Sequence, residues 1–336
     1  MFSWLLRTPA TGLRVGQLLA GLLLCGALAA VATALASWGG SSVVWALLFG
    51  IAIASVRAPS LRFALGIDFA SKQVLRLGVA LLGLQISAAA FHVLNFASVA
   101  DLAFNVAAVL FAGWLLAPLM GIERRLALVL AGSVAICGAS AAAAFALVLL
   151  PEDQGKRNVG LTIGLVSLLS MAAMLIYAPV AQLMKLDDGG AGFLLGASIH
   201  EVAHAVAAGY SIDQATGDIA TMTKLLRVAL LAPALLLTAW TQSISEDTSS
   251  VPRPPWFLVC FALFALANMA GIVPKGVGAV AAPLSRFCLV MALAGIGLTL
   301  PWRSLTAYGF RPLAMLLALS AILFAVAVTF VELAGL

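Results

Sequence analysis

The strongest constraint on this chain is a succession of continuous apolar runs, each about 20 residues long, separated by short polar breaks. Hydrophobic residues make up 63% of the sequence and charged residues only 9%, whereas soluble domains carry about 25% charged residues. Strands of a transmembrane barrel would alternate apolar and polar residues, which these runs do not. The sequence therefore predicts an all-α polytopic membrane protein, because a helix satisfies its own backbone in lipid.

The runs and breaks predict about ten to eleven transmembrane helices. We expect a single transmembrane domain over residues 1–336, with no soluble domain. The predicted segments are 15–37, 41–56, 70–90, 95–118, 122–150, 157–184, 188–210, 214–241, 254–270, 278–300 and 308–334.

The basic residues give a predicted orientation. The net charge of +5 comes mostly from arginines and lysines in the short loops, so it indicates topology and no nucleic-acid partner. A cytoplasmic N-terminus puts most of them in the inner loops, and eleven spans then place the C-terminus outside.

One internal similarity suggests an inverted repeat. The segment 80–87 (ALLGLQIS) aligns with 292–299 (ALAGIGLT), and the predicted topology runs the two in opposite directions. Antiparallel matching segments are typical of inverted-repeat transporters. Both pieces are short and apolar.

A run of small residues at 132–141 (GSVAICGASA) predicts a break in the middle of a span. A half-helix beginning there would offer free backbone amides to an anion. Cys137, Gly138, Ala139 and Ser140 are the candidate substrate-binding residues. The alternative is a seam of small residues that lets two helices pack closely.

A second polar run, 198–204 (SIHEVAH), lies inside an apolar segment. Polar and ionisable residues within a bilayer are costly, so they indicate function. His200, Glu201 and His204 are candidates for coupling to a proton or sodium ion, and Ser198 for substrate binding. Asp101 is the other clear acidic residue inside a span.

The cations that lie deepest within the predicted spans are Arg76, Lys224, Arg227 and Arg286. We expect Arg76 and Lys224 to extend to the membrane interface, because each lies within about two turns of its predicted helix end. For Arg227 and Arg286 that interpretation and binding of an anionic substrate stay equally open.

The same second run matches HExxH, in which two histidines bind zinc and the glutamate acts as general base. An intramembrane zinc metalloprotease is therefore the alternative to a transporter. No acidic residue after His204 lies where a third ligand is needed, so we expect no metal site, no cofactor and no enzyme. A nucleotide-driven pump is not expected either, since the sequence has no GxxxxGK[ST] loop.

Three segments occur in order: 76–84 (RLGVALLGL), 137–141 (CGASA) and 198–203 (SIHEVA). With these motifs the chain resembles, from about 40 to 335, the YeiH-type family of bacterial inner-membrane proteins, often named sulfate exporters. The resemblance implies a bacterial inner-membrane location and a carrier fold with inverted repeats and two discontinuous helices that cross near mid-membrane. One departure is His204, where the family pattern has glutamine.

The resulting hypothesis is a secondary transporter that exports a small inorganic or sulfonated anion such as sulfate or sulfite, driven by a proton or sodium gradient. Substrate binding is assigned to Cys137, Gly138, Ala139, Ser140, Ser198, Arg227 and Arg286, and ion coupling to His200, Glu201, His204 and Asp101. The expected partners are the anion, the coupling ion and the lipid bilayer, with a homodimer possible. The second crossing helix is either 188–210 or 278–300.

Overall fold

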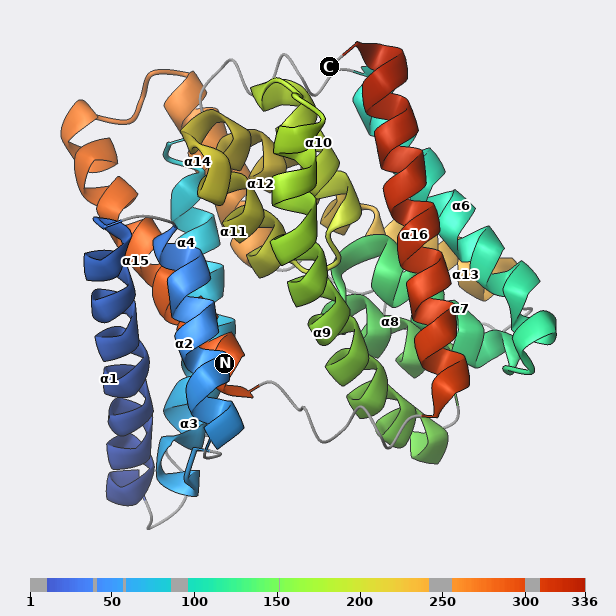
Figure 1. Cartoon of the computed structure of the whole chain (residues 1–336), viewed down its shortest axis with the longest axis horizontal. Coiled ribbons are helices and arrows are strands. Elements are labelled where there is room, and N and C mark those ends of the chain that lie inside the picture. The colour runs from blue at the N-terminus through green and yellow to red at the C-terminus, as the bar shows by residue number, and fades with distance from the viewer. Residues whose placement is uncertain are drawn as a thin grey trace. The chain divides into compact units, whose positions relative to one another are not determined.

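The computed structural model describes residues 11–38, 41–56, 59–85, 96–150, 152–241, 256–299 and 309–335, and every regular element in these ranges is a helix (Figure 1). The chain divides into two compact units. Unit 1 comprises Met1–Ile86 and Val259–Leu300, and unit 2 comprises Ser87–Leu258 and Pro301–Leu336.

Unit 1 contains the first helices of the chain and one long later helix. Its members are α1 (Thr11–Ala36), α2 (Ser42–Val56), α3 (Leu61–Phe69), the π-helical turn η1 (Ala70–Val74), α4 (Leu75–Leu82), most of α14 (Trp256–Met269) and α15 (Lys275–Thr299). The backbone stays helical from α3 through η1 into α4, so these three form one continuous rod.

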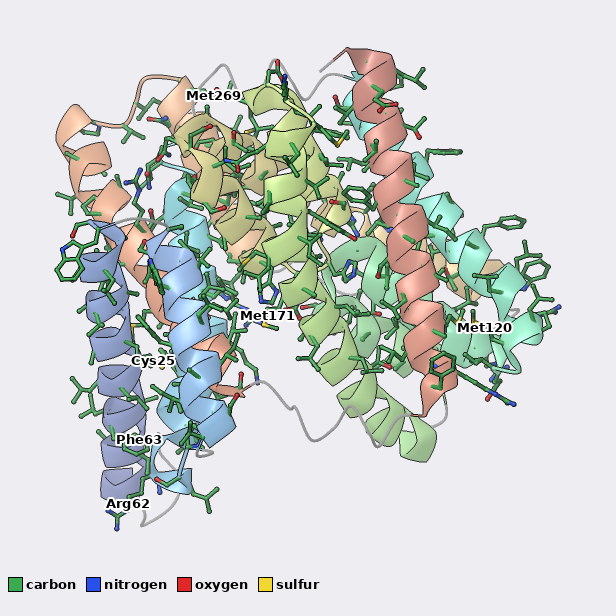
Figure 2. The ribbon with its side chains drawn as sticks, viewed as in Figure 1. Cys25, Arg62, Phe63, Met120, Met171 and Met269 are labelled. Carbon is green, nitrogen blue, oxygen red and sulfur yellow. The ribbon has the colours of Figure 1, made fainter. Side chains whose placement is uncertain are left out.

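Glycines allow the helices of unit 1 to approach one another closely. A Cβ atom on Gly50 of α2 would lie 2.5 Å from the Ala294 carbonyl oxygen and 2.9 Å from the Gly297 Cα atom, both in α15. Close backbone approach through small residues drives helix association in lipid, where the hydrophobic effect does not. Cys25 of α1 is fully buried in a cluster with Ile67, and Phe63 packs against that cluster (Figure 2).

Unit 2 contains the interrupted helices. Its members are α6 (Phe96–Met120), α7 (Arg124–Gly132), the π-helical turn η2 (Ser133–Cys137), α8 (Ala139–Leu149), α9 (Glu152–Leu183), α10 (Asp188–Ser198), α11 (Val202–Ile212), α12 (Gln214–Ala229), α13 (Leu231–Thr241) and α16 (Phe310–Ala334). Its core lies around α7 and α8, where Phe145 is fully buried. Helix α16 runs beside α6 and α10, as Figure 1 shows in red, teal and green.

The predicted helical class is confirmed. Each of the eleven predicted segments contains helix, and six helical segments among the described residues are long and apolar enough to cross a membrane. The chain is therefore a polytopic helical membrane protein. The division into two compact units was not predicted from the sequence. The single transmembrane domain over residues 1–336 stays a prediction.

Candidate functional site at the two helix breaks

The first break lies at Gly138. Helix α7 passes into the π-helical turn η2, which ends at Cys137, and α8 begins at Ala139. Gly138 has φ +66° and ψ −119°, a conformation that a residue with a Cβ atom adopts only with strain. The small residues of 132–141 thus form the broken helix that the sequence predicts.

The second break lies at residues 199–201. Helix α10 ends at Ser198, the backbone of Ile199 and Glu201 is extended, and α11 begins at Val202. Of the two alternatives for the second interrupted segment, the break falls in 188–210, while α15 is helical throughout Lys275–Thr299. Ser198 is fully buried, and its hydroxyl donates to the Leu194 carbonyl at 2.6 Å within α10.

The two breaks contact each other. A Cβ atom on Gly138 would lie 2.6 Å from the Glu201 Cγ atom and 3.1 Å from Glu201 Oε1. The first residues of α8 and α11 therefore begin on either side of this contact. Because the first four N–H groups of a helix have no partner within it, helix N-termini carry partial positive charge and favour anions.

Two cations from α12 bind the opposite, carbonyl ends of the interrupted helices. Lys224 Nζ donates to the Ile136 carbonyl at 2.8 Å and to the Ile199 carbonyl at 2.6 Å. The amine thus bridges the end of η2 and the segment after α10.

Arg227 makes the same kind of bridge with more donors. Its guanidinium donates to the carbonyls of Val134 and Ala135 in η2, and to that of Ala197 in α10. These carbonyls lie at the ends of helical segments, where no later N–H of the same helix donates a hydrogen bond to them. Lys224 and Arg227 are both fully buried.

This geometry changes the interpretation of both cations. The expectation that Lys224 extends to the interface is wrong, because its side chain is fully buried and held by two carbonyls. The donors of Arg227 are directed at backbone carbonyls, which favours a role in joining the breaks over direct contact with an anion.

Glu201 is held by hydroxyl groups from α9. Ser167 Oγ donates to Glu201 Oε1 at 2.7 Å, and the Glu201 backbone N–H donates to Ser170 Oγ at 2.9 Å. His204 Nδ1 lies 3.2 Å from Glu201 Oε2 and 3.0 Å from Ser170 Oγ. The Glu201 side chain keeps 15% of its surface exposed, so the carboxylate is held in place by hydrogen bonds and is still accessible.

His200 points to a different helix. Its Nε2 atom lies 2.9 Å from Ser320 Oγ, and that hydroxyl donates to the Leu316 carbonyl at 2.7 Å. Because the serine proton is used there, we assign the imidazole proton to Nε2. His200 Nδ1 and His204 Nε2 have no hydrogen-bond partner in the part of the chain that the structure describes.

The remaining predicted residues fall into two groups. Cys137 is buried beside the break, while Ala139 is half-buried and Ser140 is exposed at the start of α8. Asp101 is half-buried on α6 of unit 2, and Arg286 is an exposed residue of α15 in unit 1.

The serines that hold the site are not among the residues predicted from the sequence. Ser167 and Ser170 are three residues apart on α9, so they share a helical face, and Ser320 lies on α16. The spacing of the first pair is a usable signal, but single serines are common in apolar helices and often bond their own backbone.

The HExxH pattern does not form one helical face. His200 lies in the break and His204 in α11, so the regular spacing of the motif on a helix is lost. Among the described residues no group of three or more histidine, cysteine, aspartate or glutamate side chains is arranged to hold a metal ion.

Comparison with known proteins identifies the family. The family described as "Conserved hypothetical protein 698" matches residues 20–316. A UPF0324 membrane protein of Chlorobaculum tepidum is 37% identical over 318 residues, which cover 93% of this chain and 88% of that protein. The chain belongs to the UPF0324 family.

Other UPF0324 proteins agree with this membership. TauZ of Paracoccus denitrificans, a UPF0324 membrane protein, is 36% identical over 84% of this chain and 85% of its own length. YeiH of Escherichia coli, a UPF0324 inner membrane protein, is 29% identical over 88% of this chain and 89% of its own length. The resemblance seen in the sequence is thereby confirmed. No solved structure matches the chain.

Proposed function

We propose that this UPF0324 protein is a secondary transporter of the bacterial inner membrane that exports a small inorganic or sulfonated anion such as sulfate or sulfite. The observation that carries the proposal is the meeting of two helix N-termini beside a partly open carboxylate, at Gly138 and Glu201. Broken helices that face each other at mid-membrane are the usual site architecture of gradient-driven carriers.

The amides at the start of α8 are the proposed anion ligands. Ala139 and Ser140, in the first turn of α8, contribute backbone N–H groups, and Ser140 also contributes a hydroxyl. The Gly138 N–H is not free, because it donates to the Ser133 carbonyl at 2.9 Å. Lys224 and Arg227 support this role indirectly. They bind the carbonyl ends of the breaks and so reduce the negative field that an anion would otherwise meet.

Glu201 is the proposed coupling residue. Its carboxylate and a substrate anion both require the positive end of α8, so their charges compete. A proton or sodium ion on Glu201 removes that competition, and anion occupancy then depends on the coupling ion. His204, in contact with Oε2, and the hydroxyl of Ser167 position the carboxylate.

An inverted repeat is the proposed architecture. The segment 80–87 begins with the last three residues of α4, and the segment 292–299 lies in α15. Helices α4 and α15 both belong to unit 1 and pack together. Gly295 lies against Ile67 and Ser71, whereas Gly78 lies against Cys288 and Ser285. Residue numbers thus rise along one helix as they fall along the other, so the two run antiparallel, as inverted repeats require.

The test is counterflow of labelled sulfate in proteoliposomes, with sulfite and simple sulfonates as competitors. We expect saturable flux in the wild type and flux that no longer responds to pH in Glu201→Gln. Glu332→Gln, an exposed carboxylate at the end of α16, is the matched control and should behave as the wild type. Flux of Glu201→Gln with unchanged pH dependence would show the coupling role to be wrong.

The zinc metalloprotease stays the alternative prediction, and the same preparation tests it. Metal analysis of purified protein should find no stoichiometric zinc. Absence of flux for every anion, together with bound zinc that His204→Gln removes, would replace the transporter with the protease.

A further inference from the structure

A second site lies on unit 2, apart from the helix breaks. A cavity of about 530 Å³ runs between α6 and the α12–α13 segment. Its lining is almost wholly apolar and includes Val106, Leu110 and Trp114 of α6, Leu128 of α7 and Leu237 of α13. Its volume is within the range of small-molecule sites, about 300–1,000 Å³.

The cavity is an open groove. Phe111 and Leu237, which line it, are each 62% exposed. In a membrane-spanning chain, exposed apolar side chains of this kind face lipid, and an apolar groove among them is filled by lipid hydrocarbon.

The groove has the length of one leaflet. Its lining on α6 extends from Ala103 to Trp114, which is about 16 Å at 1.5 Å per residue. Half of the hydrocarbon core of a bilayer is about 15 Å. An acyl chain lying along α6 would thus be accommodated over its full depth in one leaflet.

Cations gather at the end of α6 to which the groove leads. Trp114 closes the lining there, and the Arg124 guanidinium lies 4.7 Å from the centre of its ring. Arg125 is the next residue and is exposed. A Cβ atom on Gly121 would lie 3.1 Å from an Arg311 guanidinium nitrogen, so α16 adds a third arginine.

The charge at this end is positive even with its acidic neighbour included. Glu123 is exposed in the same turn, which leaves three arginines against one carboxylate. Met120, labelled in Figure 2, marks this end of α6. Tryptophan and arginine are the residues that flank the hydrocarbon core at the headgroup level.

We propose that this groove binds one phospholipid with an anionic headgroup. An acyl chain lies along α6 against Leu110 and Leu237, and the phosphate accepts hydrogen bonds from Arg124 and Arg311. The positive-inside distribution places these arginines on the cytoplasmic side, where anionic lipids and basic interhelical pockets meet. Arginine suits the role because its planar fork binds phosphate oxygens in pairs.

The test measures lipid retention and lipid-dependent stability in the whole protein. Lipids that survive detergent purification are counted by mass spectrometry, and the thermal midpoint is measured in phosphatidylglycerol and in phosphatidylcholine. We expect a retained anionic lipid, and a thermal midpoint several degrees higher in phosphatidylglycerol, since a ligand stabilises the state that binds it.

Two variants separate the headgroup from the chain. The double variant R124Q/R311Q should lose the preference for phosphatidylglycerol, and Ala107→Phe, which fills the groove, should lose the retained lipid. The matched controls are Arg62→Gln, an exposed arginine of unit 1, and Ala100→Phe, an exposed alanine of α6 outside the groove lining. Both controls should keep the lipid and its effect.

Three outcomes would overturn the proposal. Equal stabilisation by both lipids would show that the arginines do not select an anion. Retention of lipid by Ala107→Phe would place the lipid elsewhere. A change of oligomeric state in Ala107→Phe, with lipid content unchanged, would show that a second copy of the chain fills the groove.

Discussion

The two units of this protein use different means to hold helices together in lipid. In unit 1 the helices approach through glycines, and among its described residues the only buried polar side chain is that of Ser285. In unit 2 the buried side chains include His200, His204, Lys224 and Arg227. The two cations bind carbonyls at the helix breaks, and the two histidines contact serines of neighbouring helices. Continuous helices can pack on shape alone, whereas interrupted helices leave backbone groups that need polar partners.

This contrast predicts that unit 2 depends most on its cations. Arg227→Met keeps an unbranched apolar stem and removes every donor to the carbonyls of Val134, Ala135 and Ala197. Each buried group left unsatisfied costs about 1–3 kcal/mol, so we expect little folded protein. The measurement is monodisperse yield and thermal midpoint in detergent, with Arg62→Gln as control. A wild-type midpoint in Arg227→Met would mean that the breaks do not need this arginine.

The corresponding weak point of unit 1 is a glycine. Gly50→Val places a side chain 2.5 Å from a carbonyl oxygen of α15, so the two helices must separate. Overpacking of this kind costs about 1–3 kcal/mol. The thermal midpoint should fall, and the apparent sulfate affinity of the protein that remains folded should stay unchanged. Gly26→Ala, at a helical position with open space, is the control. An altered affinity in Gly50→Val would contradict the separation of roles between the units.

At the first break we expect function to suffer more than stability. Gly138→Ala requires a positive φ, which costs about 1–3 kcal/mol for a residue with a Cβ atom. It also pushes a methyl group against Glu201 Cγ, 2.6 Å away. Sulfate counterflow should be lost while protein is still recovered in folded form. Normal counterflow in folded Gly138→Ala would remove the first break from the anion site.

The smallest effect is expected on the surface of unit 1. Lys72 and Asp68 form an ion pair one helical turn apart, with side chains 60% and 58% exposed. Exposed pairs contribute about 0–1 kcal/mol. Lys72→Gln should therefore leave the thermal midpoint and transport nearly unchanged. A large fall in either would show that this surface has a partner that the single chain does not contain.

The sequence predicted those features of the backbone that depend directly on the type of residue. Small residues around Gly138 predicted the first break, because only glycine adopts its φ and ψ freely. The polar residues around Glu201 indicated the second segment, because such residues are costly in lipid. The first break was thus predicted beside the alternative of a packing seam, and the second stayed open between 188–210 and 278–300 until the structure placed it in 188–210.

The sequence did not predict the hydrogen bonds that a side chain makes with backbone groups far away along the chain. Lys224 lies close to a predicted helix end along the chain, which by itself predicts an interfacial position. Its actual partners, the carbonyls of Ile136 and Ile199, are exposed only because two other segments break. Nothing in the local pattern around Lys224 carries that information. Arg286 shows the converse, since its position within an apolar segment did not reveal that it is exposed in the other unit.

The carbonyl bridges made by Lys224 and Arg227 also have a consequence for biogenesis. Both broken helices precede α12 in the chain, and Arg227 follows Val134 by 93 residues. Until α12 has entered the bilayer, the carbonyls at both breaks lack these donors, which is costly in hydrocarbon. The contact between the two breaks should therefore form late in membrane insertion, so that a chain truncated before α12 leaves it unformed and open to quality-control proteolysis.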